Sequence, residues 1–344
     1  MRTATTVEAS SDPEVATFVV EAERIGLDEC WVAEAWGSDA LSLLGFLAAR
    51  TERLQLGSGV IQVGTRSPVA IAQAALTLAE LSSGRFALGL GSSGPQVIEG
   101  LHGASFARPL TRMRETIAVI RQAFAGEKVS FTGRTIEIPR PGGEGRPMRL
   151  STRANPDIPV HVASLSPRML ELTGEVADGW LGTSFVPEGA AAYFSHLDAG
   201  LAAAGRTRED LTVCQGAEVA FAESPEELAP MVAARKKGLA FSLGGMGTAS
   251  TNFYHDAYAR QGFAEVAESV RERWQAGDRD GAADLVPDAM VLATTLLGTE
   301  DTVRERLAVW ADAGVDTVRL YPAGDSLDER LTTLGRAIDL VHSL

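Results

Sequence analysis

Short runs of β-branched and aromatic residues alternate with longer amphipathic segments along almost the whole chain. The short runs have the length of strands, and the longer segments repeat apolar residues at helical spacing. The predicted strands are residues 4–8, 29–34, 54–60, 86–91, 159–163, 179–183, 212–220 and 317–321. The predicted helices are residues 13–25, 39–49, 69–82, 109–125, 167–176, 187–204, 225–235, 300–313 and 327–343. Eight strands that alternate with helices predict a parallel sheet closed into a (β/α)8 TIM barrel.

Two segments interrupt this alternation. Residues 127–157, after the fourth strand, are rich in arginine, proline and glycine, whereas residues 236–297, after the seventh strand, are mostly helical in pattern. A second domain would need a hydrophobic core of its own, and neither segment is long enough to be expected to build one. We therefore predict a single domain, residues 1–344, that carries two insertions.

Composition and charge narrow the class of protein. Of the 344 residues, 45% are hydrophobic, so the chain can bury a large core. A formal net charge of −14 opposes nonspecific binding to nucleic acid, which depends on cationic contacts to phosphate. The sequence lacks the run of about 18 apolar residues that a membrane helix needs, and we expect a cytoplasmic protein without a membrane partner. The two cysteines and five histidines do not have metal-site spacing, so no metal site is expected.

Residues that follow the strands of a parallel barrel lie on its active face. By this criterion Glu8, Glu34, Trp36 and His102 are candidate catalytic residues. Glu8 and Glu34 could form a carboxylate pair at the barrel mouth, where burial would raise the pKa of one and make it a proton donor. Each could equally be a satisfied structural carboxylate. His102 could equally have a structural role.

A glycine-rich loop follows the fourth strand. Residues 89–94 match the G-x-G-x-x-G pattern of dinucleotide-binding proteins. That pattern requires a helix to start at the turn, whereas Pro95, Gly100, Gly103 and Pro109 predict that the loop continues. We therefore reject the dinucleotide interpretation. The loop could bring backbone N–H groups close to a planar or anionic ligand, or its glycines could serve tight turns alone.

Residues 31–40, 56–60, 81–91 and 93–103 closely resemble the luciferase-like monooxygenase superfamily. Within it they resemble the branch that uses the deazaflavin coenzyme F420, including methylenetetrahydromethanopterin reductase-like proteins. The resemblance implies an insertion-bearing (β/α)8 barrel, usually dimeric, that binds F420 at the carboxyl ends of its strands. It also implies transfer of a hydride to or from C5 of the deazaflavin.

The same resemblance implies roles for particular residues. Glu34 matches the acidic residue that contacts the deazaflavin, and Ser58, Gly59 and Val60 match a bulge with a non-proline cis peptide at Gly59–Val60. Trp36 matches a position that shapes the substrate pocket, unless it is a packed aromatic. The further cofactor contacts implied are Gly91, Ser92 and Ser93 beside the ring or ribityl chain, and Ala163, Ser164, Leu165, Gly182 and Thr183 near the ribityl phosphate.

One position departs from the family pattern. Many F420 enzymes have a histidine directly after the acidic residue, but this chain has Ala35 there. Any role of that histidine in proton transfer therefore cannot be carried over.

The anionic tail of F420 would need local cations in a protein of this charge. Lys236 and Lys237 could supply them, and backbone amides at Gly244, Gly245 and Met246 could hold the phosphate. The helix dipole alone also favours a basic run at a helix end, so this pair could be purely structural.

These inferences predict an F420-dependent oxidoreductase that acts on a small organic substrate. It would reduce a C=C, C=N or C=O bond, or oxidise an alcohol in the reverse direction, with the cofactor performing the hydride chemistry. An FMN-dependent monooxygenase of the same superfamily is the alternative enzyme. A barrel that binds a flavin without catalysis is the alternative outside enzymes, because a fold does not guarantee a function. We also expect a homodimer.

Overall fold

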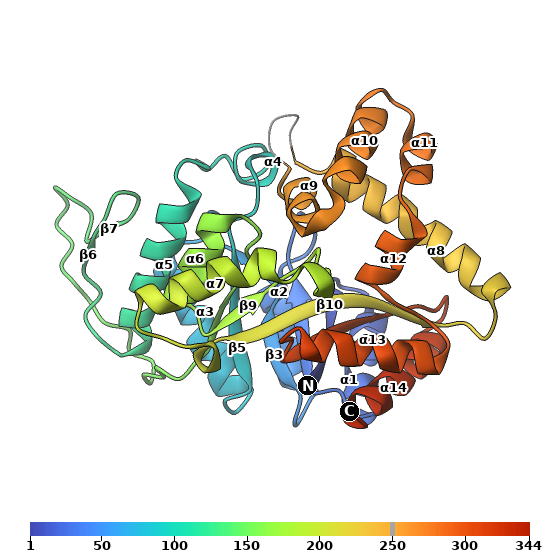
Figure 1. Cartoon of the computed structure of the whole chain (residues 1–344). Coiled ribbons are helices and arrows are strands. Elements are labelled where there is room, and N and C mark those ends of the chain that lie inside the picture. Colours follow the sequence, from blue (N-terminus) through green and yellow to red (C-terminus); the bar gives the residue numbers. More distant parts are fainter. Residues whose placement is uncertain (248–251) are drawn as a thin grey trace.

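Eight parallel strands close into a barrel (Figure 1). The computed structural model describes residues 1–247 and 252–344. The barrel strands are β1 (Arg2–Glu8), β2 (Glu29–Ala33), β3 (Gln55–Ser58), β5 (Phe86–Gly91), β8 (Val160–Val162), β9 (Gly179–Leu181), β10 (Thr212–Phe221) and β12 (Thr317–Pro322). β1 pairs with β2 and β12, and β10 pairs with β12 and β9, which closes the ring. The predicted (β/α)8 barrel is confirmed.

Helices cover the outside of this ring. They are α1 (Pro13–Arg24), α2 (Ala40–Ala48), α3 (Pro68–Leu81), α5 (Pro109–Phe124), α6 (Pro167–Val176), α7 (Ala191–Ala203), α13 (Glu300–Asp312) and α14 (Leu327–His342). The helix after β10, α8 (Pro225–Ala240), packs mainly on the second insertion. Several begin at a capping side chain: the side chain of Asp12 accepts from the N–H of Glu14, and that of Asp39 from the N–H of Ser42. α8 runs five residues beyond the predicted end at Arg235. The predicted helix 187–204 is divided into η1 (Pro187–Gly189) and α7.

Side chains fill the barrel interior below its mouth, that is, on the side away from the carboxyl ends of the strands. Ala4, Trp31, Ala87, Leu181 and Cys214 form a buried cluster inside the ring, and the ring of His161 lies 5.0 Å from that of Trp31. A larger cluster lies between the outer faces of the strands and the helices. Because the interior is plugged below, any ligand must enter at the carboxyl ends of the strands.

The first insertion contains a short hairpin of β6 (Phe131–Thr132) and β7 (Glu137–Ile138). The second insertion continues α8 through η3 (Phe241–Gly245), α9 (Phe253–Tyr258), η4 (Ala259–Phe263), α10 (Ala264–Gln275), α11 (Arg279–Asp284) and α12 (Asp288–Thr294). It ends in β11 (Leu296–Gly298), an unpredicted strand that pairs with the end of β10. In Figure 1, α10, α11 and α12 stand together beside α8.

A second hydrophobic cluster joins the second insertion to α8 and to the neighbouring part of the barrel. Leu239, Leu243, Val270 and Met290 are fully buried in it, together with residues from α9 and α11. The cluster also contains Val186, Ala220 of β10 and Val232 of α8, so the insertion shares it with the rest of the barrel. The single-domain arrangement stays a prediction.

No helix among the described residues combines the length and the apolar character needed to cross a bilayer.

Candidate functional site

One side of the barrel mouth is built from glycines, which we call the glycine wall: Gly57 and Gly59 on the third strand and Gly89 and Gly91 on β5. A Cβ atom added at any of them would lie less than 3.0 Å from another atom. The obstructing groups are Trp31 for the first two, the backbone carbonyl of Ser58 for Gly89, and the side chain of Val60 for Gly91. Only glycine fits at these positions, so backbone, Trp31 and Val60 form this face.

The glycine wall contains the predicted bulge. A cis peptide joins Gly59 to Val60, as predicted, and divides the third strand into β3 and β4 (Ile61–Gln62). Ser58 is fully buried, and its hydroxyl both donates to the carbonyl of Gly89 and accepts from the N–H of Gly89, each at 2.9 Å. The hydroxyl of Ser58 therefore ties β3 to β5 and does not face the mouth.

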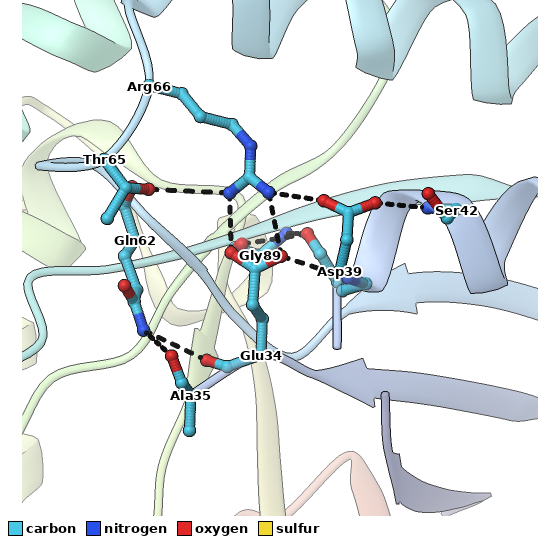
Figure 2. Close-up of polar contacts among 10 residues, drawn as sticks. Glu34, Ala35, Asp39, Ser42, Gln62, Thr65, Arg66 and Gly89 are labelled. Carbon is cyan, nitrogen blue, oxygen red and sulfur yellow. Dashed lines mark hydrogen bonds and ion pairs between the residues drawn. The ribbon is translucent and has the colours of Figure 1, made fainter. Parts of the chain in front are cut away.

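Glu34 is held in an ion-pair network beside this wall (Figure 2). Its two carboxylate oxygens accept from Nη1 and Nη2 of Arg66 at 2.6 and 2.9 Å, and one also accepts from the N–H of Ala40 at 3.0 Å. Arg66 reaches Asp39 at 2.5 Å as well. The hydrogen bond to Glu34 is the main cause of the raised pKa of Arg66. This arrangement fixes the loop between β2 and α2. The partner of Glu34 is therefore Arg66, whereas the sequence suggested a carboxylate pair with Glu8.

Gln62 links the same loop to β4. Its Nε2 donates to the backbone carbonyls of Glu34 and Ala35 at 3.3 and 2.9 Å (Figure 2). Because both partners are acceptors, the amide nitrogen must face them, and Oε1 points elsewhere. The residue is only 3% exposed, and its Oε1 has no hydrogen-bond partner among the described residues. A buried acceptor without a partner costs about 1–3 kcal/mol, which a bound ligand with an N–H or O–H group would recover.

The opposite side of the mouth is polar, and we call it the polar wall: Thr6 and Glu8 on β1, Glu218 on β10 and Tyr321 on β12. Alternation along β1 places Thr6 and Glu8 on the same face as the interior residue Ala4. Glu218 and Tyr321 are neighbours in the register of β10 and β12. The Thr6 hydroxyl is buried without a partner among the described residues, and Glu218 lies 3.8 Å from Nε of Arg235.

The cofactor-binding residues predicted after β8 and β9 mostly make hydrogen bonds within the protein. The hydroxyl of Ser164 shares a hydrogen bond with Thr173, and its carbonyl accepts from Trp180. The carbonyl of Leu165 accepts from Arg260 at 2.6 Å, and that of Gly182 from the guanidinium of Arg319. Ala163 packs at the edge of the interior cluster, and Thr183 is exposed at the rim. These segments surround the mouth, but their polar side chains mostly serve the fold.

The loop after β5 contains a helical turn that the sequence did not predict. α4 spans Pro95–Ile98, so the expectation of a continuous loop is wrong there, although four residues are too few for the helix of a dinucleotide fingerprint. Ser92 and Ser93 are partly exposed on this loop, and His102 is exposed beyond α4. Gln96 donates to the carbonyl of Gly247 at 2.9 Å, which joins the loop to the second insertion.

Trp36 and the lysine pair lie further out. Trp36 is 71% exposed after β2, so it is not a buried packing residue. Lys236 is paired with Asp288 of α12 at 2.5 Å, and Lys237 is exposed in the last turn of α8. Two other cations reach residues at the strand ends: Arg235 lies near Glu218, and Arg260 binds Leu165.

The predicted phosphate nest is tightly packed. A Cβ at Gly244 would overlap Trp274, and one at Gly245 would overlap Phe241 and Trp274, so packing explains both glycines. The N–H of Met246 already donates to the carbonyl of Phe241 at 3.1 Å.

Five residues of the site were missed from the sequence or left without a role: Thr6, Gln62, Arg66, Glu218 and Tyr321. Alternation along β1, β10 and β12 was the available signal for three of them. Within the described parts of the chain, no group of three or more potential metal ligands is close enough to hold a metal ion.

The family model for luciferase-like monooxygenases matches residues 2–317. The chain belongs to the luciferase-like monooxygenase family. This luciferase-like protein is 40% identical over 319 residues to a Mycobacterium tuberculosis protein whose name assigns it provisionally to the coenzyme F420-dependent oxidoreductases, with 90% of this chain and 91% of the relative covered. It is 28% identical to the 5,10-methylenetetrahydromethanopterin reductase of Archaeoglobus fulgidus, with 94% of each chain covered.

Solved structures give the same fold. The coenzyme F420 dependent tetrahydromethanopterin reductase from Methanopyrus kandleri superposes with a TM-score of 0.79 at 23% identity, covering 97% of each chain. A type II Baeyer–Villiger monooxygenase from Pseudomonas putida, in complex with FMN, superposes with a TM-score of 0.67 at 17% identity, covering 99% of this chain and 98% of the other. At these identities the likeness concerns the fold alone.

Proposed function

We propose that this luciferase-like protein is a coenzyme F420-dependent oxidoreductase that transfers a hydride between the deazaflavin C5 and a small organic substrate. The substrate would contain an electron-poor C=C, C=N or C=O bond, or an alcohol in the reverse reaction. The observation that carries the proposal is the pairing of a side-chain-free wall with a polar wall across one barrel mouth. The 40% identical relative supports F420 as the cofactor.

The residues of the mouth fit a flat heterocycle of this kind. At the glycine wall the ring would lie against the backbone, Trp31 and Val60, which fill the places where side chains of the four glycines would stand. The unpartnered Oε1 of Gln62 can accept from the N–H group on the pyrimidine edge of a deazaflavin. When bound, the cofactor supplies the hydride chemistry.

The protein's own residues would bind the cofactor, orient the substrate and shield both from water. The clamp of Glu34 and Arg66 keeps the rim loop in place, and Gln62 fixes the backbone of that loop. The exposed Trp36 would cover one side of the substrate, and Ser92 and Ser93 would line the ribityl side. Arg235 and Arg260 would attract the phosphodiester at the ends of β8 and β10.

Fluorescence titration separates the two cofactors. We expect purified protein to bind F420 tightly and FMN weakly, because the proposed site includes cations for an extended anionic tail. Tight binding of FMN without binding of F420 would favour the monooxygenase alternative instead. Consumption of reduced F420 with a panel of enones, imines and ketones then separates an enzyme from a carrier, since a carrier shows none.

The two lysines provide a test of tail binding. Replacing Lys236 and Lys237 by alanine should weaken F420 more than an analogue without the glutamate tail. Lys128, in the first insertion, is the matched control, and K128A should leave both affinities unchanged. An equal loss for F420 and the tail-less analogue in the double variant would remove the lysines from the tail site.

We also propose that the protein forms a cytoplasmic homodimer through α2 and α3. α2 has no charged residue and α3 has only Glu80, and Phe46 and Leu81 on these helices are 51% and 59% exposed. Large apolar side chains exposed on neighbouring helices favour a partner at this surface. Light scattering should give twice the chain mass, and Phe46→Glu should shift it to the monomer. Monomeric wild-type protein at micromolar concentration would contradict the dimer.

A further inference from the structure

Tyr321 places its hydroxyl inside the barrel mouth. It lies near the carboxyl end of β12, level with Glu218 of β10, and is partly exposed. A Cβ added to Gly216 would lie less than 3.0 Å from the hydroxyl oxygen and from the ring of Tyr321. The phenol therefore lies across the interior face of β10, in space that the absent side chain of Gly216 leaves free.

A buried cation lies directly below this phenol. Arg319 is two residues earlier on β12, so its side chain is on the same face, and it is only 6% exposed. Its guanidinium donates to the carbonyl of Gly182. Burial lowers the pKa of Arg319, but the nearby Tyr321, Cys214 and Glu29 raise it above its usual value. Arg319 therefore places a permanent positive charge near the phenol.

The other acids of the polar wall are less suited to donate a proton. Glu218 faces the guanidinium of Arg235, with its carboxylate 3.8 Å from Nε. Glu8 is exposed to water at the rim. A tyrosine hydroxyl, by contrast, is a hydrogen-bond donor. The histidine that many F420 enzymes have after the acidic residue is replaced here by Ala35, so the rim loop offers no imidazole at that place.

We infer that Tyr321 is the catalytic residue that protonates the substrate. The inference rests on the proposed function and names the proton donor of that reaction. In the reduction of a C=O or C=N bond, the bound cofactor would supply the hydride that forms the new C–H bond at carbon. The π electrons would then pass to the heteroatom, which would take the proton from the Tyr321 hydroxyl. The phenolate would recover a proton from water at the open rim.

Replacing Tyr321 by phenylalanine tests this role. The variant keeps the ring and loses only the hydroxyl, so we expect F420 affinity in the fluorescence titration to stay within about twofold of the wild type. With the enone, imine or ketone that the wild type reduces best, we expect kcat to fall by about 10²-fold or more. The wild type should also show a solvent deuterium isotope effect on kcat that the variant lacks. Tyr254→Phe, in α9, is the matched control and should keep wild-type kcat.

The outcomes separate this inference from the proposed function. Wild-type kcat in Y321F, or an equal loss of F420 binding and turnover, would overturn Tyr321 as the proton donor while leaving the F420-dependent activity intact. A wild-type protein that neither binds F420 nor consumes its reduced form would remove the proposed function, and the inference with it.

Discussion

The two walls of the barrel mouth are built by opposite means. On the glycine wall, four positions lack side chains because neighbouring backbone, Trp31 and Val60 already occupy the space. On the polar wall, Thr6, Glu8, Glu218 and Tyr321 project from ordinary strand positions into the mouth. The first wall is therefore defined by tight packing, and the second by the chemistry of its side chains. Substitutions should damage stability on one wall and chemistry on the other.

The largest expected effect comes from Gly89→Ala on the glycine wall. The new methyl group would overlap the backbone carbonyl of Ser58, which cannot move without breaking the link from β3 to β5. We expect a loss of at least about 3 kcal/mol in the free energy of unfolding, or failure to fold, because overpacking against backbone has no cheap relief. Chemical denaturation followed by circular dichroism measures it.

Gly216→Ala provides the matched substitution on the polar wall. Its methyl group would meet the phenol of Tyr321, a side chain that can rotate away at its outer end. We expect a loss of about 1–2 kcal/mol in stability, with a larger loss of turnover because the hydroxyl is displaced. Equal losses of stability in the two variants would contradict the distinction between the walls.

The next effect concerns His161, which lies below both walls against Trp31. Burial lowers the pKa of His161 from 6.5 to about 4; nearby Asp178 opposes this shift, and Arg319 adds to it. Between pH 6.5 and 4 the unfolded chain therefore binds a proton that the folded chain does not. The free energy of unfolding should fall as the pH drops through this window, by about 3 kcal/mol from this residue.

His161→Gln isolates that contribution. The loss of stability between pH 7 and pH 4.5 should be smaller by about 2–3 kcal/mol in the variant than in the wild type. His342→Gln, at the surface of α14, serves as the control for the loss of one imidazole. If H161Q lost as much stability on acidification as the wild type, His161 would bind its proton in the folded protein as readily as in the unfolded chain.

A smaller effect is expected at the rim of the glycine wall. Glu34→Gln replaces the carboxylate that Arg66 binds through two nitrogens, in a pair whose side chains are 10% and 24% exposed. Asp39 remains to hold Arg66, so we expect a loss of about 2 kcal/mol. Glu300→Gln, which breaks the exposed pair with Arg304, should cost under about 0.5 kcal/mol. Similar melting temperatures for E34Q and E300Q would contradict a structural clamp.

The sequence predicted most of the barrel because strand and helix patterns are local. All eight barrel strands lie within a few residues of their predicted ranges. The three-residue β11 was missed because so short a run has no detectable period. The hydrophobic cluster that α8 shares with the second insertion was not predicted, because α8 had been assigned to the barrel alone.

The candidate site was less predictable because it depends on closure of the ring. The glycines of the bulge carry a family pattern, and the cis peptide was found where that pattern places it. The positions of Tyr321 and Glu218 side by side, by contrast, depend on the register of β10 and β12. These strands are about 100 residues apart in the sequence. Arg66 pairs with a residue 32 positions earlier, and nothing in the loop sequence indicates that contact.

The smallest effect is expected at the two cysteines, which should not react in the folded protein. Cys214 lies inside the barrel below the polar wall, and Cys30 lies on the outer face of β2; both are fully buried. Burial raises the pKa of each thiol to about 12, so almost no thiolate is present at pH 8. We expect no reaction of the native protein with a disulfide reagent over minutes, and two thiols per chain in denaturant. Rapid modification of Cys214 alone, identified by peptide mass spectrometry, would show that the polar wall opens to solvent while the glycine wall stays closed. Modification of both at one rate would instead indicate global unfolding, and the two walls would then not differ in how firmly they are held.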